Sequence, residues 1–215
     1  SIARPVTKYA KMLRNPNEVR YELEKCLYLC NSGRPGPVLL DLPIDLQKCE
    51  IEPASLIGFD KSMEAPTYEL DKIGKQIDEF LSDLLLAQRP SLLIGGGVRN
   101  AGAVDELQQL SKMLKVPMYP TWNALDIVTN DNPYYGGPIG TYGGAGRNFG
   151  IQNSDLLLAI GSRISGRITG GNVMTFARGA KKYLVDIDKG LLQRQNQEVP
   201  FDVNIFADAK LFIQM

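Results

Sequence analysis

The chain has 215 residues, of which 44% are hydrophobic and 22% are charged, a composition typical of a globular protein with a sizeable core. Its 24 lysines and arginines balance its 24 aspartates and glutamates, so it lacks the basic excess that nucleic-acid-binding proteins usually carry. The absence of histidine excludes mechanisms based on imidazole, and the three cysteines include no CxxC pair, which argues against a zinc cage or a disulfide scaffold.

Residues 1–45 predict one helix followed by one strand. Asn15 and Pro16 are typical of a helix start, and Gly33 is placed to end the helix. Between them apolar residues recur at helical spacing, and both thiols are expected on the core-facing stripe: Val19, Leu23, Cys26, Leu27 and Cys30. Residues 37–43 form an apolar run typical of a buried parallel strand. Because these two elements cannot close a core, we interpret them as the end of a domain whose start is missing.

Residues 46–67 contain Pro53, Gly58 and Pro66 without a clear period, which predicts a linker lying over a surface. Residues 68–215 then alternate between helical and strand patterns. Helices are predicted at 73–85 and, after a capping Asn100, at 104–114; strands are predicted at 91–94, 116–119, 155–160, 183–187 and 203–206. This alternation indicates an α/β fold, a parallel sheet with helices on both faces.

The residues that directly follow these strands suit a nucleotide, because ligands of parallel sheets bind at the carboxyl ends of the strands. Gly95–Gly97 would let the backbone approach a phosphate, and residues 161–167 (GSRISGR) offer two arginines and two hydroxyls to a diphosphate or ribose. Asp186 and Asp188 suit ribose hydroxyls, and seven glycines lie between Gly136 and Gly150. Each feature alone is also explained as a structural turn; together they favour a mononucleotide or dinucleotide site.

The sequence predicts no catalytic residue and no metal site. It contains neither a GxSxG nucleophile elbow nor a Walker phosphate loop. Asp126 and Asp131 lie in a loop without a partner of complementary role. No apolar run approaches the ~20 residues that cross a bilayer, and no signal peptide opens the chain, so we expect a cytoplasmic protein without membrane or nucleic-acid partners.

Residues 31–45 (NSGRPGPVLLDLPID) resemble the signature that closes the pyrimidine-binding domain of thiamine diphosphate enzymes of the acetolactate synthase type. Residues 4–8 (RPVTK) resemble a segment upstream of that signature. Further segments follow the central domain of that family in order: 89–90, 95–97, 139–143, 153–159, 161–163, 167–170 and 185–188. The resemblance implies a remnant of the pyrimidine-binding domain over 1–45, a linker over 46–67, and a central nucleotide-binding-like domain over 68–215.

The resemblance also implies that the chain is a fragment of a transferase that decarboxylates a 2-oxo acid such as pyruvate and joins the product to an acceptor carbonyl. Thiamine diphosphate and magnesium would be held by the domains outside this chain, in a parent that is a homodimer or homotetramer. We expect the isolated fragment to be inactive. Two alternatives stay open: a free-standing nucleotide-binding module, and a spacer and oligomerisation domain with an empty cleft.

In acetolactate synthases the central domain binds FAD in a role without redox chemistry. Carried over by motif, the contacts here would be Arg34, Gly96, Gly97, Thr121, Trp122, Ile139, Gly140, Thr141, Tyr142, Gly161, Ser162, Arg163, Asp186, Ile187 and Asp208. The chain departs from the family at two of these places. Residues 139–143 replace the LGMHG motif and its histidine, and residues 162–167 lack the two acidic residues of an ARFDDR-like loop. FAD, ADP or no ligand in this domain therefore all remain open.

Overall fold

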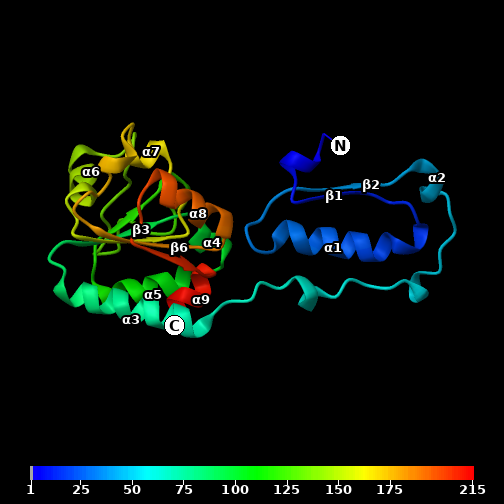
Figure 1. Cartoon of the computed structure of the whole chain (residues 1–215), viewed down its shortest axis with the longest axis horizontal. Helices are drawn as coiled ribbons and strands as arrows, with labels where there is room; N and C mark the ends of the chain where they lie inside the picture. The colour runs from blue at the N-terminus through cyan, green and yellow to red at the C-terminus, as the bar shows by residue number, and fades with distance from the viewer. Residues whose placement is uncertain (1) are drawn as a thin grey trace. The chain divides into compact units, whose positions relative to one another are not determined.

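The structure is a computed structural model that describes residues 2–215, with the backbone alone for residues 194–198. The chain forms two compact units, unit 1 up to Thr67 and unit 2 from Tyr68 to Met215 (Figure 1).

Unit 1 is built on a parallel pair of strands and one helix. Its elements are β1 (Tyr9–Met12), α1 (Val19–Asn31), β2 (Val38–Asp41) and α2 (Ile44–Gln47), with short 3-10 turns at Arg4–Val6, Pro16–Glu18, Pro53–Ser55 and Lys61–Glu64. The expected helix and strand are both present, and Asn15 accepts a hydrogen bond from the backbone nitrogen of Asn17 at 3.1 Å at the helix entry. The structure adds β1, which pairs with β2 so that Tyr9 lies opposite Val38.

The buried stripe of α1 differs from the expected one. Glu22 and Cys26 are buried, whereas Leu23 and Leu27 are 44% and 65% exposed and Cys30 is only partly buried. The reason is polar: Glu22 accepts a hydrogen bond from the Tyr9 hydroxyl at 2.7 Å, so a carboxylate takes the place that faces β1. The expectation that both thiols are buried is therefore right for Cys26 and wrong for Cys30.

The segment after α2 packs along α1 (Figure 1). The Phe59 ring lies edge-on to Tyr21 at a centroid distance of 5.5 Å, and the Phe59 backbone nitrogen donates to the Glu24 carboxylate at 2.7 Å. Leu56 and Phe59 are the buried side chains of this segment. The stretch from Leu56 to Phe59 thus packs on α1 within unit 1.

Unit 2 contains a five-stranded parallel sheet in the order β4-β3-β5-β6-β7. The strands are β3 (Pro90–Ile94), β4 (Met118–Pro120), β5 (Leu156–Ile160), β6 (Lys181–Asp186) and β7 (Val203–Phe206). All five expected strands are confirmed. The helices are α3 (Leu70–Leu86), α4 (Gly97–Asn100), α5 (Val104–Leu114), α6 (Ala145–Gln152), α7 (Gly166–Thr169), α8 (Lys189–Glu198) and α9 (Ala209–Gln214), with 3-10 turns at Trp122–Ala124 and Val173–Thr175.

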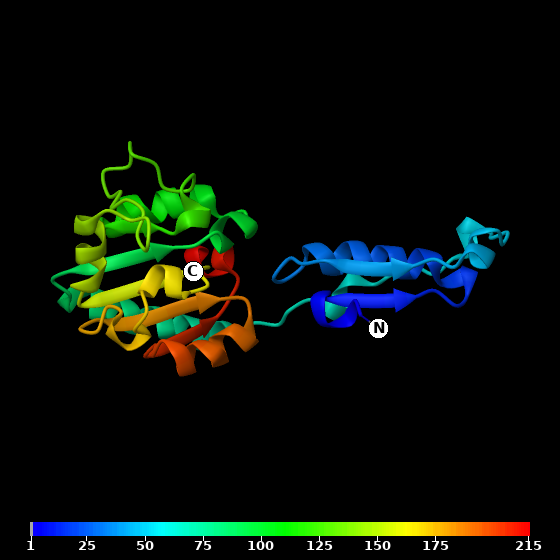
Figure 2. The same ribbon diagram turned by 90° about the horizontal axis from the view of Figure 1, so that it is seen from above.

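Helices cover both faces of this sheet, as expected (Figures 1 and 2). On one face Phe80 of α3, Leu107 of α5 and Phe212 of α9 join a core with alternate strand residues such as Leu158. On the other face, Ile151 of α6 and Leu192 of α8 pack with the intervening residues: Leu93, Leu157, Ala159 and Leu184. Every residue of β5 is buried, which explains its continuous apolar run.

One expected helix cap is wrong. Asn100 is the last residue of the short helix α4, and α5 begins after Ala103, which makes no side-chain cap bond. A tight turn through Gly102, with φ +64°, separates the two helices. Across residues 2–215, none of the helices combines the length and the apolar character needed to cross a membrane.

Candidate functional site

Most of the expected site residues lie in loops at the carboxyl ends of the unit 2 strands, and Figure 2 shows how these strands are arranged. The loops that follow the strands are Gly95–Gly97 after β3, Thr121–Trp122 after β4, Gly161–Arg163 after β5, Ile187 after β6 and Asp208 after β7. β3 lies between β4 and β5, so the chain passes from β3 to β4 on one side of β3 and then crosses to β5 on its other side. Such a switch in strand order is where ligands of open parallel sheets bind.

At this switch point the two glycine turns contact each other directly. The Gly97 backbone nitrogen donates to the carbonyl oxygen of Gly161 at 2.9 Å. A β-carbon added to Gly97 would lie 2.7 Å from the Gly161 α-carbon, and Gly161 has a φ of +59°. Glycine at these positions is therefore required by the close approach of two turns, whether or not a ligand binds.

Ser162, next to this turn, supplies an unsatisfied hydroxyl. Its side chain is 2% exposed, and among the described residues its oxygen has no hydrogen-bond partner. Buried hydroxyls usually have a hydrogen-bond partner, because a buried hydroxyl without a hydrogen bond lowers the stability by about 1–3 kcal/mol. The Gly161–Arg163 turn thus contains a polar group whose hydrogen bonding is incomplete.

The arginines at this edge fall into two kinds. Arg99 forms a two-point ion pair with Asp126, its Nε atom lying 2.9 Å from Oδ2, and also donates to the Asn123 carbonyl at 3.0 Å. These hydrogen bonds from Arg99 lower the pKa of the Asp126 carboxyl. The guanidinium groups of Arg163 and Arg167 are exposed and form no ion pair with any described residue. They leave uncompensated positive charge beside the glycine turns.

The loop position of Asp126 suggested a carboxylate without a partner, but the structure pairs it with Arg99. Its ion pair with Arg99 ties the loop after β4 to the turn after β3, across 27 residues of sequence. Nothing in the local sequence pattern indicates that pairing.

Trp122 and Tyr142 bring two exposed aromatic rings to the same edge. They are 68% and 78% exposed, and their centroids lie 5.7 Å apart. The loop that carries Tyr142 is attached to the loop after β5, because the Thr141 backbone nitrogen donates to the Arg167 carbonyl at 2.8 Å. Direct contacts thus link Trp122, the loop 139–142 and the loop after β5 at this edge.

Backbone groups engage both carboxylates expected to face a ribose, Asp186 and Asp188, and also Asp208, which the family resemblance adds as a contact. Asp188 accepts from the Leu191 backbone nitrogen at 3.1 Å. Asp186 accepts from the Asp188 backbone nitrogen at 2.9 Å. Asp208 accepts from the Lys210 and Leu211 nitrogens, at 2.9 and 3.4 Å, and so caps α9. Capping accounts for Asp208 without a ligand. Arg34 lies in unit 1, between α1 and β2.

Residues 77–215 match the family described as "Thiamine pyrophosphate enzyme, central domain". The chain belongs to the thiamine pyrophosphate enzyme family. Acetolactate synthase large subunit of Corynebacterium glutamicum is 35% identical to it over 202 residues, which cover 93% of this chain and 32% of the relative. Glyoxylate carboligase of Escherichia coli O157:H7 is 35% identical over 217 residues, 98% of this chain and 34% of the relative.

Acetolactate synthase 1, chloroplastic, of Zea mays is 31% identical over 217 residues, 99% of this chain and 32% of the relative. The expected resemblance to thiamine diphosphate enzymes of the acetolactate synthase type is thus confirmed. The chain spans about a third of the length of the curated relatives it matches.

Proposed function

We propose that this chain is part of a longer thiamine diphosphate-dependent transferase that decarboxylates a 2-oxo acid such as pyruvate and ligates the product to an acceptor carbonyl. The proposal is carried by similarity over more than nine-tenths of the chain to relatives named acetolactate synthase and glyoxylate carboligase. Residues 1–45 would be the end of the pyrimidine-binding domain, 46–67 a linker and 68–215 the central domain. Homodimeric or homotetrameric assembly and a cytoplasmic location stay predictions.

Exposed apolar side chains of unit 1 support the proposal that it is part of a larger domain. Val6, Leu27 and Ile44 are 71%, 65% and 66% exposed. A parallel pair of strands with one helix leaves such groups without a covering layer. Thiamine diphosphate with magnesium, when bound, supplies the chemistry of decarboxylation and carbon–carbon bond formation, and we assign none of that chemistry to residues of this chain.

We further propose that unit 2 binds FAD or ADP in a structural role. The Gly161–Ser162 backbone, the Ser162 hydroxyl and the Arg163 and Arg167 guanidinium groups would hold the diphosphate, and Trp122 and Tyr142 would face a planar ring. Support comes from Ser162, whose hydroxyl has no hydrogen-bond partner among the described residues, from the two arginines, which form no ion pair with those residues, and from the exposed ring pair. Guanidinium groups bind diphosphate oxygens in two-point hydrogen bonds.

Calorimetric titration of the purified chain with ADP and with FAD tests this second proposal. Arg163→Ala should weaken binding about tenfold or more, equivalent to ~1.4 kcal/mol. Arg178→Ala is the matched control, since Arg178 is an exposed arginine just before the amino end of β6 and should leave the affinity unchanged. Equal affinities of the two variants would contradict the proposed diphosphate site, and no binding of either nucleotide would favour an empty spacer domain.

Turnover assays test the first proposal. The isolated chain, supplied with thiamine diphosphate, magnesium and pyruvate, should release no carbon dioxide above the background rate. Sustained turnover would show that the reactive machinery lies within these residues and would overturn the assignment of the chain to part of a longer enzyme.

A further inference from the structure

The Asn148 side chain, on α6, uses its amide oxygen and its amide nitrogen in two hydrogen bonds to a single glycine eight residues earlier. Its Oδ1 atom accepts from the Gly140 backbone nitrogen at 2.8 Å, and its Nδ2 atom donates to the Gly140 carbonyl at 3.0 Å. The polarity of the two backbone groups fixes the orientation of the amide, because only oxygen can accept from N–H and only NH₂ can donate to C=O. Asparagine matches this pair of groups in length and in polarity.

Gly140 is held equally closely on its other side. Its φ is +97°, and an added β-carbon would overlap the carbonyl oxygen of Arg167. That carbonyl also accepts from the Thr141 backbone nitrogen at 2.8 Å and from the Thr141 hydroxyl at 3.2 Å. The loop 139–143 is thus fixed between Asn148 and the loop that carries Arg163 and Arg167.

The same loop ends in the aromatic contact at the sheet edge. Ile139 anchors one side of it in the core, and Tyr142 reaches the Trp122 ring on the other. Loss of the Asn148 hydrogen bonds would remove the restraint on one side of Gly140 and so loosen the placement of Thr141 and Tyr142.

We propose that Asn148 is a positioning residue that holds residues 140–142 in the conformation in which they face a nucleotide. The ligand part of this proposal rests on the proposed function of unit 2. The conformational part does not, and it can be measured without any ligand.

The conformational test uses the single tryptophan of the chain, Trp122, as its probe. In Tyr142→Ala, acrylamide should quench Trp122 fluorescence more strongly than in the wild type, because the neighbouring ring is gone. Asn148→Ala should raise the quenching constant at least halfway to that of Tyr142→Ala. Asn148→Asp should do the same, since a carboxylate can accept from the Gly140 nitrogen but cannot donate to its carbonyl.

Asn153→Ala is the matched control, because it removes an asparagine bond to the Phe149 carbonyl at the far end of α6. It should leave the quenching constant at the wild-type value. Wild-type quenching in both Asn148 variants overturns the proposal, and so does wild-type quenching in Tyr142→Ala, since the ring contact would then be absent in solution. The near-isosteric Asp variant keeps the test valid if the Ala variant does not fold.

Affinity for ADP tests the ligand part separately. Asn148→Ala should weaken ADP binding about tenfold while Asn153→Ala leaves it unchanged. Full affinity in Asn148→Ala despite altered quenching would overturn the role in ligand positioning. If the wild type binds no nucleotide, the proposed function of unit 2 fails and the quenching result still decides whether Asn148 positions the loop.

Discussion

Lys115 ends α5 in a backbone conformation that suits glycine. Its φ and ψ are 54° and 38°, and its side chain is exposed. Left-handed geometry costs an L-residue roughly 1–2 kcal/mol, and glycine is the usual residue at such a helix end. We expect Lys115→Gly to raise the free energy of unfolding by ~1 kcal/mol in urea titrations followed by circular dichroism.

Lys112→Gly is the control for that change, since Lys112 lies in the last turn of the same helix with helical geometry. It should lower the stability by up to ~1 kcal/mol, because glycine is a poor helix former. Loss of stability in both variants would contradict the strain assigned to Lys115.

Gly161 is a glycine of the candidate site whose replacement should be costly. Its φ is +59°, and a β-carbon would lie 2.8 Å from the Gly97 α-carbon, so neither turn can yield without breaking the contact between them. We expect Gly161→Ala to lower the free energy of unfolding by about 2–4 kcal/mol. Gly166→Ala, where an added β-carbon meets nothing within 4 Å, should be neutral or slightly stabilising. Similar unfolding midpoints for the two variants would count against the packing of the two turns.

For these glycines the sequence predicts the position in the fold but not the contacts. A residue that directly follows a buried strand can be recognised from the local sequence. On that basis Gly95–Gly97 and residues 161–163 are correctly predicted to lie at one edge of the sheet. Whether such a glycine serves a ligand or a neighbouring turn depends on a contact made by distant residues. The Arg99–Asp126 ion pair and the Asn148 bonds to Gly140 are side-chain contacts of the same kind, and no periodicity encodes them.

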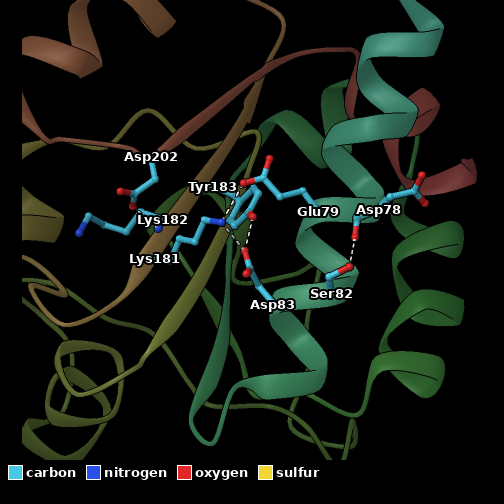
Figure 3. Close-up of polar contacts among 8 residues, drawn as sticks. All are labelled: Asp78, Glu79, Ser82, Asp83, Lys181, Lys182, Tyr183 and Asp202. Atoms are coloured by element: carbon cyan, nitrogen blue, oxygen red, sulfur yellow. Dashed lines mark hydrogen bonds and ion pairs between the residues drawn. The ribbon is translucent and has the colours of Figure 1, made fainter.

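At the scale of elements, α3 is attached to β6 by a polar cluster beside the core (Figure 3). The Lys181 Nζ atom lies 2.8 Å from a carboxylate oxygen of Glu79 and 2.7 Å from one of Asp83, and the Tyr183 hydroxyl donates to Asp83. Glu79 and Asp83 are four residues apart, so both reach the same strand from one helix face. The next strand residue, Lys182, points to the other side of the sheet, where its ammonium donates to the Ala177 and Ala180 carbonyls.

This cluster makes stability depend on pH through Asp83. Hydrogen bonds from Lys181 and Tyr183 lower the pKa of the Asp83 carboxyl. A carboxyl with a lowered pKa in the folded state stabilises fully above its ordinary pKa of about 4, and this contribution is lost as the pH falls through the folded-state value. We expect Asp83→Asn to unfold more easily than the wild type by ~1 kcal/mol at pH 7, with the difference narrowing as the pH falls below about 4.

Asp78→Asn is the control for this pH effect, because Asp78 lies on the same helix and points away from the cluster (Figure 3). It should follow the wild-type stability within ~0.5 kcal/mol at every pH. A stability difference between Asp83→Asn and the wild type that stays unchanged as the pH falls well below about 4 would contradict the assigned cause.

How clearly the sequence predicts a helix or strand depends on how its residues are buried. β3, β5 and β6 are buried on both faces, so their apolar runs are unambiguous. β1 has three partly buried residues and one exposed residue and contains a lysine, so its sequence, YAKM, carries no strand pattern. The stripe of α1 was misplaced because a buried carboxylate, Glu22, takes an inward position that apolar periodicity assigns to leucine.

At the scale of the whole molecule, the two units differ in how completely each buries its apolar residues. The sheet of unit 2 has core clusters on both faces, whereas unit 1 has a two-stranded sheet and several exposed apolar side chains. A two-stranded sheet is marginally stable on its own, while a five-stranded sheet covered on both faces carries a full core. Independent stability is therefore expected of unit 2 and not of unit 1.

Separate expression of residues 68–215 and of residues 1–67 tests this expectation. The first should unfold in one cooperative urea transition, with a midpoint close to that of the corresponding transition in the full chain. The second should lack a cooperative transition, because the entropy cost of ordering the chain exceeds the free energy gained from its small buried surface. Cooperative unfolding of residues 1–67 alone would mean that unit 1 is a complete domain, and it would remove the support that its exposed apolar side chains lend to a longer parent enzyme.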